Sequence, residues 1–320
     1  MKGNICKIGL IGLGKMGQNH LRVLSILKEV EIIFIFDYDC ENLACTSQKY
    51  SIYASSSSKL ENDLRKVDAV IICTPTSTHA EYVMRCSKYV RNIFVEKPLA
   101  SNLKETIKLH EFIQEKNLNI KVGFIERYNP VIQQLSNVLY ESKGVIHLDF
   151  KRTNKLSSRI KDVDVVIDLM IHDIDLALYL NGPFQSVEAQ GYCNDNMIDF
   201  AIAVIKHKNG RLSRVLASRI TDKKIRLIEA TCVDMFIDCD LLRKEIIINK
   251  QNNINNTDQK DYCISSLQEL VAVSSQEALL SELQEFILST FSDKKFKASN
   301  SFEALDAVRV CDIVQKSILK

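Results

Sequence analysis

The sequence has almost no net charge, no long apolar run and no clustered metal ligands. Its 42 lysines and arginines balance 40 aspartates and glutamates over 320 residues, so it offers no basic stripe to a nucleic-acid backbone. No segment approaches about 18 uninterrupted apolar residues, and the first residues do not resemble a signal peptide. We therefore predict a cytoplasmic protein whose partners include neither nucleic acid nor a membrane.

Metal ligation is also not indicated. The ten cysteines are scattered between Cys6 and Cys311, without a CxxC pair or a cysteine–histidine group at metal-ligand spacing. Free cysteine in a reducing compartment behaves as a small apolar side chain. We expect mostly buried thiols and no metal site.

The first part of the chain alternates short apolar runs with amphipathic segments, which is typical of a parallel sheet with crossover helices. We predict strands at 6–11, 31–36, 69–73, 92–95 and 119–124, and helices at 16–27, 78–88 and 103–115. A chain of 320 residues exceeds what one hydrophobic core usually organises, so a second domain is expected.

Beyond residue 123, strand-like runs follow one another with short turns, which favours a mostly antiparallel sheet. We predict strands at 145–151, 186–192, 200–205, 213–218, 226–231 and 244–248, and helices at 163–180, 276–290 and 302–319. The Asn/Gln-rich stretch 249–261 predicts a flexible surface loop. The predicted fold is α/β: a doubly wound parallel sheet in residues 1–123 and an α+β domain with an open sheet in 124–320.

A glycine-rich turn opens the first predicted helix. Gly12 permits a tight turn, Gly14 lets the backbone approach a pyrophosphate, and Gly17 lets the helix pack closely on the strand. The helix N-terminus then directs unpaired N–H groups at the phosphates. We predict that this turn, with Lys15 and Met16, binds a dinucleotide in a Rossmann domain.

Asp37 ends the second predicted strand, twenty residues beyond Gly17. A carboxylate there accepts hydrogen bonds from the adenosine ribose hydroxyls and repels a 2′-phosphate, so NAD is favoured over NADP. Asp39 is an alternative for the same role, or a surface residue.

The loops after the third and fourth strands should meet the nicotinamide half of the cofactor. The loop Thr74-Pro75-Thr76, with His79 in the first turn of the next helix, is a candidate for cofactor contact. Ser77 or Thr78 is expected to cap that helix, and a capping role alone for these Ser/Thr residues is the alternative. Glu96-Lys97-Pro98 follows the fourth strand. A lysine at this edge, partly desolvated beside a cationic cofactor, can serve in proton transfer, whereas a lysine at a strand end is usually solvated.

A second polar group lies on the predicted helix 163–180. Asp168, His172 and Asp175 are separated by four and three residues, so they share one helix face, and we predict that they bind the substrate. Oxidation of a secondary alcohol needs a base for the hydroxyl proton, and either Lys97 or His172 can take it. Asp168 then fixes the imidazole tautomer or binds an adjacent hydroxyl.

As a set, these motifs resemble the Gfo/Idh/MocA oxidoreductase family over essentially the whole chain. The matching elements are the glycine turn with His20, the loop from Thr74 to His79, Glu96-Lys97-Pro98, and Asp168-x-x-x-His172. The resemblance implies that Lys97, Asp168 and His172 are the catalytic and substrate-holding groups. It also implies a cis peptide before Pro98 and a homo-dimer or homo-tetramer formed through the C-terminal sheet.

Residues 123–130, Gly-Phe-Ile-Glu-Arg-Tyr-Asn-Pro, resemble family members that act on nucleotide sugars. This implies oxidation of a secondary sugar hydroxyl, at C3 of UDP-N-acetylglucosamine in a lipid A type pathway. Arg127 would then pair with a phosphate and Asn129 with a sugar hydroxyl or amide, while Arg152 and Lys151 would meet a diphosphate or remain solvated. The alternatives are a dehydrogenase of a free sugar or inositol, and a non-catalytic NAD(H)-binding sensor.

Overall fold

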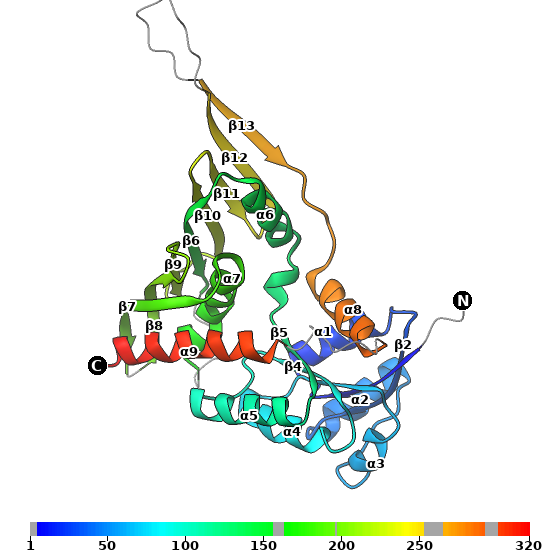
Figure 1. The fold of residues 1–320 in the computed structure, drawn as a ribbon. Coiled ribbons are helices and arrows are strands. Elements are labelled where there is room, and N and C mark those ends of the chain that lie inside the picture. Colours follow the sequence, from blue (N-terminus) through cyan, green and yellow to red (C-terminus); the bar gives the residue numbers. More distant parts are fainter. Residues whose placement is uncertain (1–4, 156–162, 196, 253–264, 292–299) are drawn as a thin grey trace, which may run out of the picture. The chain divides into compact units, whose positions relative to one another are not determined.

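The computed structural model describes residues 5–155, 163–195, 197–252, 265–291 and 300–320. Two compact units emerge (Figure 1): Met1–Ile125 with Ala278–Val308, and Glu126–Glu277 with Arg309–Lys320. The first boundary lies two residues from the predicted end of the first domain. The segment Ala278–Val308, however, belongs to the first unit, whereas the sequence placed it in the second domain.

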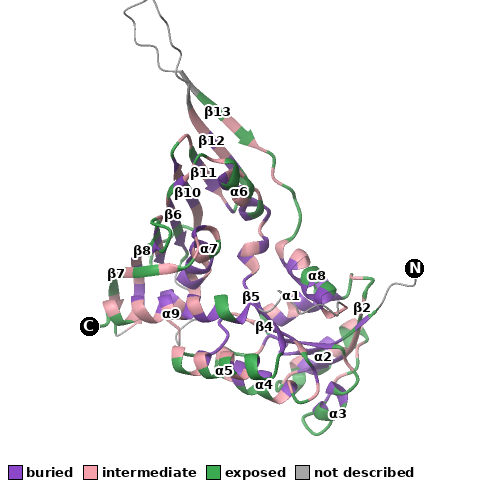
Figure 2. Ribbon diagram, in the orientation of Figure 1, coloured by how far each residue is buried: buried purple, intermediate pink, exposed green. Residues whose placement is uncertain are grey.

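The first unit is built on the parallel sheet that the sequence predicted. Its order is β2-β1-β3-β4-β5, and every neighbouring pair is parallel. β3 and β5 are buried along their whole length, as Figure 2 shows for β5 and as expected for strands covered on both faces. The strands are β1 (Cys6–Ile11), β2 (Val30–Phe36), β3 (Ala69–Ile72), β4 (Asn92–Glu96) and β5 (Asn119–Gly123).

Helices cover both faces of this sheet, with α1 and α8 on one side and α4 and α5 on the other (Figure 1). Their bounds are α1 (Lys15–Leu24), α2 (Cys40–Tyr50), α3 (Leu60–Leu64), α4 (His79–Cys86), α5 (Leu103–Glu115) and α8 (Ala278–Thr290), with a 3₁₀ turn η1 (Thr76–Thr78) before α4. The sequence did not predict α2 and α3. In α2 only Leu43 and Thr46 are buried, so its apolar periodicity is weak.

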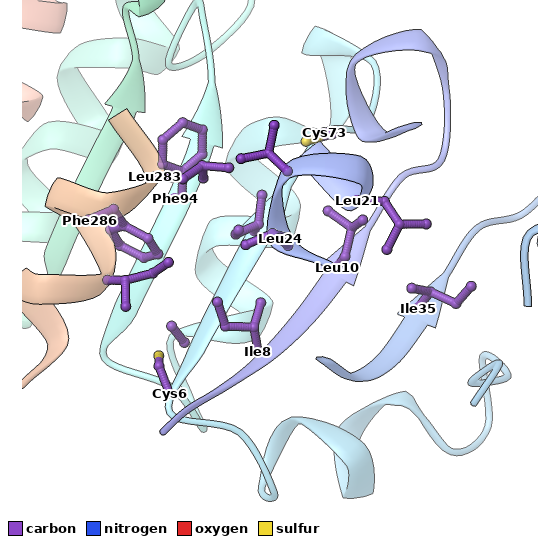
Figure 3. Packing of buried hydrophobic residues seen from close by; sticks show 14 of the residues in the cluster. Cys6, Ile8, Leu10, Leu21, Leu24, Ile35, Cys73, Phe94, Leu283 and Phe286 are labelled. Atoms are coloured by element: carbon purple, nitrogen blue, oxygen red, sulfur yellow. The ribbon is translucent and has the colours of Figure 1, made fainter. Parts of the chain in front are cut away.

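The core of the first unit explains why α8 belongs to it. Phe286 of α8 meets the ring of Phe94 edge to face, with centroids 5.6 Å apart. Leu283 joins the same cluster, which unites β1, α1 and α8 (Figure 3). Burying a leucine or phenylalanine fully contributes about 1.5–3 kcal/mol relative to leaving it exposed, so α8 is held by its apolar face.

The second unit contains an eight-stranded sheet in the order β13-β12-β11-β10-β6-β9-β8-β7. Only β6 and β9 pair in parallel among these described strands, which confirms the mostly antiparallel prediction. β11 and β13 were not predicted. Residues 249–252 belong to β12 rather than to the predicted loop, whose remainder, 253–261, lies outside the described residues. The bounds are β6 (Val145–Thr153), β7 (Phe184–Asn194), β8 (Met197–His207), β9 (Leu212–Ser218), β10 (Ile225–Cys232), β11 (Phe236–Asp240), β12 (Glu245–Asn252) and β13 (Ser265–Val271).

One face of this sheet is covered by helical segments. A single π-helical turn, η3 (Val166–Met170), runs directly into α7 (Ile171–Asn181), and both contact β6 or β9. α7 ends at Gly182, whose φ of +88° favours glycine; this confirms the predicted stop. α6 (Pro130–Glu141) contacts β11 and β12. The remaining described helical segments are η2 (Ile125–Tyr128) and α9 (Ser301–Ile318), and a unit boundary falls within each of them. Among the described helices none has the length and apolar character of a membrane span.

Candidate active site

The turn between β1 and α1 requires glycine at two positions. Gly12 has a φ of +92°, and a Cβ there would lie 2.6 Å from the backbone of Cys73. A Cβ on Gly17 would lie 2.0 Å from the carbonyl oxygen of Gly12. A Cβ on Gly14, by contrast, would meet nothing within 4 Å. Gly12 and Gly17 therefore serve packing, while Gly14 leaves the backbone open to a ligand.

The carboxylate of Asp37 is fixed beside this turn. Its Oδ2 accepts a hydrogen bond from the N–H of Leu13 at 2.6 Å, and its Oδ1 accepts one from the N–H of Asp39 at 2.9 Å. The free lone pairs remain available to the ribose hydroxyls of a dinucleotide. Asp39 has another role, because its carboxylate caps α2 by accepting from the N–H groups of Glu41 and Asn42.

A cavity of about 650 Å³ lies in the first unit next to the glycine turn. The cavity reaches from Asp37, where the adenosine ribose is expected, to Lys97. Its size and its donors fit NAD. All predicted cofactor residues except Gly17 line it: Gly12, Gly14, Lys15, Met16, Asp37, Thr74, Pro75, Thr76, His79, Glu96 and Lys97.

The loop after β3 is held by its own side chains. The hydroxyl of Thr78 lies 2.8 Å from both Thr74 Oγ1 and Pro75 O, so it turns back into the loop instead of capping α4. His79 is 1% exposed and lies between two carbonyl oxygens, 2.7 Å from Pro98 O and 2.9 Å from Thr74 O. Burial lowers the pKa of His79, and the two carbonyls oppose this shift only in part.

Glu96 and Lys97 lie half-buried in the cavity wall at the end of β4. The Lys97–Pro98 peptide is cis, as the family resemblance implied. Glu96 Oε1 is hydrogen-bonded to Nε2 of the buried His20 at 2.6 Å. The sequence had noted His20 only as part of the motif, so this contact is an addition from the structure.

Cys73 lies near this pair, and the ligand atoms of His20, Cys73 and Glu96 all fall within 4.8 Å of one another. The 2.6 Å separation of His20 and Glu96 is a hydrogen-bond length, whereas two ligands of a tetrahedral zinc ion lie about 3.3 Å apart. Burial also raises the pKa of the Cys73 thiol well above its usual value, with Glu96 adding to the shift. We therefore assign the contact between His20 and Glu96 to a hydrogen bond rather than to shared metal ligation.

In the second unit, Asp168 lies on η3 and His172 on the first turn of α7, and both are half-buried. Single π-helical turns occur frequently at functional sites because they redirect side chains by one residue. The start of η3 is fixed by Asp164, whose carboxylate accepts from the N–H groups of Val166 and Ile167 at 3.0 Å each. Its other oxygen accepts from Gln315 at 2.7 Å.

The structure brings two predicted substrate residues together as an ion pair. Arg127 donates to both carboxylate oxygens of Asp175, at 2.8 and 2.6 Å, and its guanidinium lies 5.1 Å from the centre of the Tyr179 ring. Asp175 is 1% exposed. Asp175 therefore holds Arg127 rather than extending the polar stripe of Asp168 and His172.

Arg152 is likewise engaged inside the protein. It is 2% exposed, donates to Asp173 at 2.8 and 2.7 Å, and donates to Glu126 at 2.8 Å. Lys151 is exposed on the opposite face of β6, because successive strand residues alternate. The two side chains do not share a face, so the predicted joint contact with one diphosphate does not fit this strand.

Asn129 also has internal partners. Its Oδ1 caps α6 by accepting from the N–H of Val131 at 3.1 Å, and its amide lies 3.3 Å from Glu126. A bond from this side chain to a sugar stays a prediction.

The sequence did not predict the roles of several residues at these sites. Glu126 accepts from both Arg152 and the partly exposed Arg226, at 2.8 and 2.9 Å. Burial alone would raise the pKa of Glu126, but the two arginines hold it below its usual value. Glu126 lies within the 123–130 motif, which could have marked it as a site residue, but no role was predicted for it from the sequence. In the first unit, Phe36, Tyr38, Asn42, Cys73 and Tyr82 also line the cavity.

The glycine turn, the fixed carboxylate of Asp37 and a lysine at the far end of the cavity define a dinucleotide-dependent oxidoreductase. Residues 6–124 match the oxidoreductase family with an NAD-binding Rossmann fold, and residues 145–232 match the GFO/IDH/MocA C-terminal domain. The chain belongs to the Gfo/Idh/MocA family. It is an NAD-dependent oxidoreductase.

Individual relatives have narrower descriptions. The UDP-N-acetylglucosamine 3-dehydrogenase of Acidithiobacillus ferrooxidans is 30% identical over 247 residues, which are 76% of each chain. Its solved structure superposes with a TM-score of 0.87 over 98% of both chains at 25% identity. The myo-inositol 2-dehydrogenase of Thermotoga maritima is 26% identical over 67% of this chain and 68% of its own.

Proposed function

We propose that the protein oxidises a secondary hydroxyl of a sugar with NAD, and that the substrate is UDP-N-acetylglucosamine, oxidised at C3. The observation that carries the reaction type is the position of Lys97 in the wall of a cavity whose glycine turn and Asp37 fit NAD. The similarity to the Acidithiobacillus enzyme, over 76% of both chains, supports the substrate. The proposed location is the cytoplasm.

When bound, NAD would supply the hydride acceptor that oxidation of the alcohol carbon requires. The hydroxyl proton must leave in the same reaction, so that alcohol and NAD become ketone, NADH and a proton. Either Lys97 or His172 takes this proton. Asp168 orients the imidazole or binds the neighbouring hydroxyl.

A second candidate is a dehydrogenase of a free sugar or inositol, which the 26% identity to myo-inositol 2-dehydrogenase favours. A protein that only binds NAD(H) is the third, although both Lys97 and His172 are present. The three candidate functions differ in whether the protein turns over a sugar substrate and in whether that turnover requires the UDP group.

Purified protein is incubated with NAD and, in separate arms, UDP-N-acetylglucosamine, N-acetylglucosamine, glucose and myo-inositol, with hydrazine to trap the ketone. We expect NADH to form with the nucleotide sugar, with kcat/KM at least about 100-fold above that for N-acetylglucosamine, because a lost set of phosphate contacts is costly. Faster turnover of a free sugar or of myo-inositol would overturn the substrate. NADH binding with no turnover in any arm would favour the sensor.

We further propose that the outward face of the β7–β9 region forms a homo-dimer or homo-tetramer contact. Ile202 of β8 and Leu216 of β9 are paired residues on this face, and Val204 beside them is 45% exposed. Apolar faces of open sheets usually become buried against another subunit. We expect light scattering at micromolar concentration to give the mass of two or four chains, and Val204→Glu to lower it. A monomeric parent protein would refute the contact.

A further inference from the structure

Two buried histidines reach the residues on either side of Lys97. His20 of α1 is 0% exposed, and its Nε2 lies 2.6 Å from Glu96 Oε1. His79, the first residue of α4, is 1% exposed, and its Nδ1 lies 2.7 Å from the carbonyl oxygen of Pro98. Lys97 thus stands between two residues that are each tied to a different helix of the same unit.

Packing around the hydrogen bond between His20 and Glu96 fixes both side chains. Its ring meets Phe94 edge to face, with centroids 5.1 Å apart, so the imidazole has a fixed plane. On the neighbouring strand, Gly123 leaves room for the carboxylate, since a Cβ there would lie 3.1 Å from Glu96 Oε2 and 3.0 Å from the Phe94 ring. The carboxylate is therefore held in one position.

His79 lies within hydrogen-bond distance of two loops of the cavity. Its other nitrogen, Nε2, lies 2.9 Å from the carbonyl oxygen of Thr74, in the loop after β3. Carbonyl oxygens only accept hydrogen bonds, so the ring must donate, through one nitrogen when neutral and through both when protonated. A neutral His79 ring therefore holds one of these two loops, and the shorter contact, 2.7 Å to Pro98 O, is the one next to Lys97.

We propose that His20 and His79 are positioning residues that together hold Lys97 at the distance and angle that proton transfer needs. The inference rests on the proposed role of Lys97. A displacement of about 1 Å at a reacting group costs on the order of 100-fold in rate, so two short hydrogen bonds on either side of the lysine have a measurable effect on kcat.

Matched amide variants test each tie separately. An asparagine amide nitrogen occupies nearly the position of histidine Nδ1, and a glutamine amide nitrogen that of Nε2. His20→Gln and His79→Asn therefore retain the donors to Glu96 and Pro98, whereas His20→Asn and His79→Gln lose them. Both members of each pair remove the imidazole, so a general packing role would affect them equally.

We expect each variant that loses a donor to have a kcat about tenfold or more below that of the matched variant that retains it. KM for NAD should change by less than about twofold in the two His20 variants, since the glycine turn and Asp37 are untouched. Equal losses within each pair, or losses confined to KM, would overturn the proposal. Thermal unfolding of all four variants establishes that they are folded.

A second readout does not need a substrate. The rate of acetylation of Lys97 by acetic anhydride, followed by mass spectrometry relative to the exposed Lys104, reports the surroundings of the lysine. We expect this ratio to change about threefold or more in His20→Asn and His79→Gln and to stay near the parent value in their partners. This result would support the positioning role even if no sugar were oxidised. Identical ratios in all four variants would contradict it.

Discussion

Replacing Lys97 with alanine should lower kcat for the nucleotide sugar by about 10²- to 10⁴-fold, which is the usual contribution of a positioned acid or base. Lys97 lies in the wall of the cavity that fits NAD, directly after Glu96, and is half-buried there. KM for NAD should change little, because the glycine turn and Asp37 are the residues proposed to bind the other half of the cofactor. Initial rates of NADH formation at varied NAD and sugar measure both constants.

The matched control is Lys104→Ala, since Lys104 is exposed near the start of α5 and is not part of this cavity wall. It should retain the parent kcat. A Lys97→Ala variant that keeps more than about a third of the parent kcat would remove Lys97 as the proton acceptor and leave His172 in that role. Binding of NADH, followed by its fluorescence, shows that the variant site is intact.

The cofactor half of the site is largely predictable from sequence, for reasons that are local. β1 begins and ends where the apolar run predicts, and Gly12, Gly14 and Asp37 follow strand ends that meet at one edge of the sheet. Their spacing fixes their positions, since parallel strands place their carboxyl ends together. Eleven of the twelve predicted cofactor residues consequently line one cavity.

The substrate half is less predictable because its partners are distant in sequence. Helical spacing places Asp175 near the face of His172, but spacing does not reveal that Arg127, 48 residues earlier, takes up its carboxylate. The partner of Arg152 is Asp173, which lies on the same helix as Asp175 and is 21 residues from Arg152 in the sequence. In the first unit, the amphipathic pattern predicts α8 but not that its Phe286 meets Phe94.

Removing the charge of Arg152 should destabilise the second unit by about 3–5 kcal/mol, the range seen when one partner of a buried ion pair is lost. Arg152→Met keeps most of the volume but leaves the buried Asp173 without its partner, and Asp173 is 3% exposed. Burial already raises the pKa of Asp173 against the opposing effect of Arg152, so its charge depends on that guanidinium. Urea unfolding followed by circular dichroism measures the free energy of unfolding.

Arg214→Met provides the control on the same sheet. Arg214 of β9 pairs with Asp149 of β6, but its side chain is 48% exposed, and exposed ion pairs contribute about 0–1 kcal/mol. The Arg152→Met variant combined with Asp173→Asn should lose less than the sum of the two single variants, because the second change removes the unpaired charge. If Arg152→Met costs no more than Arg214→Met, the buried cluster is not a stabilising element. A rise in KM for the nucleotide sugar without loss of stability would then return Arg152 to the substrate-binding role that the sequence predicted.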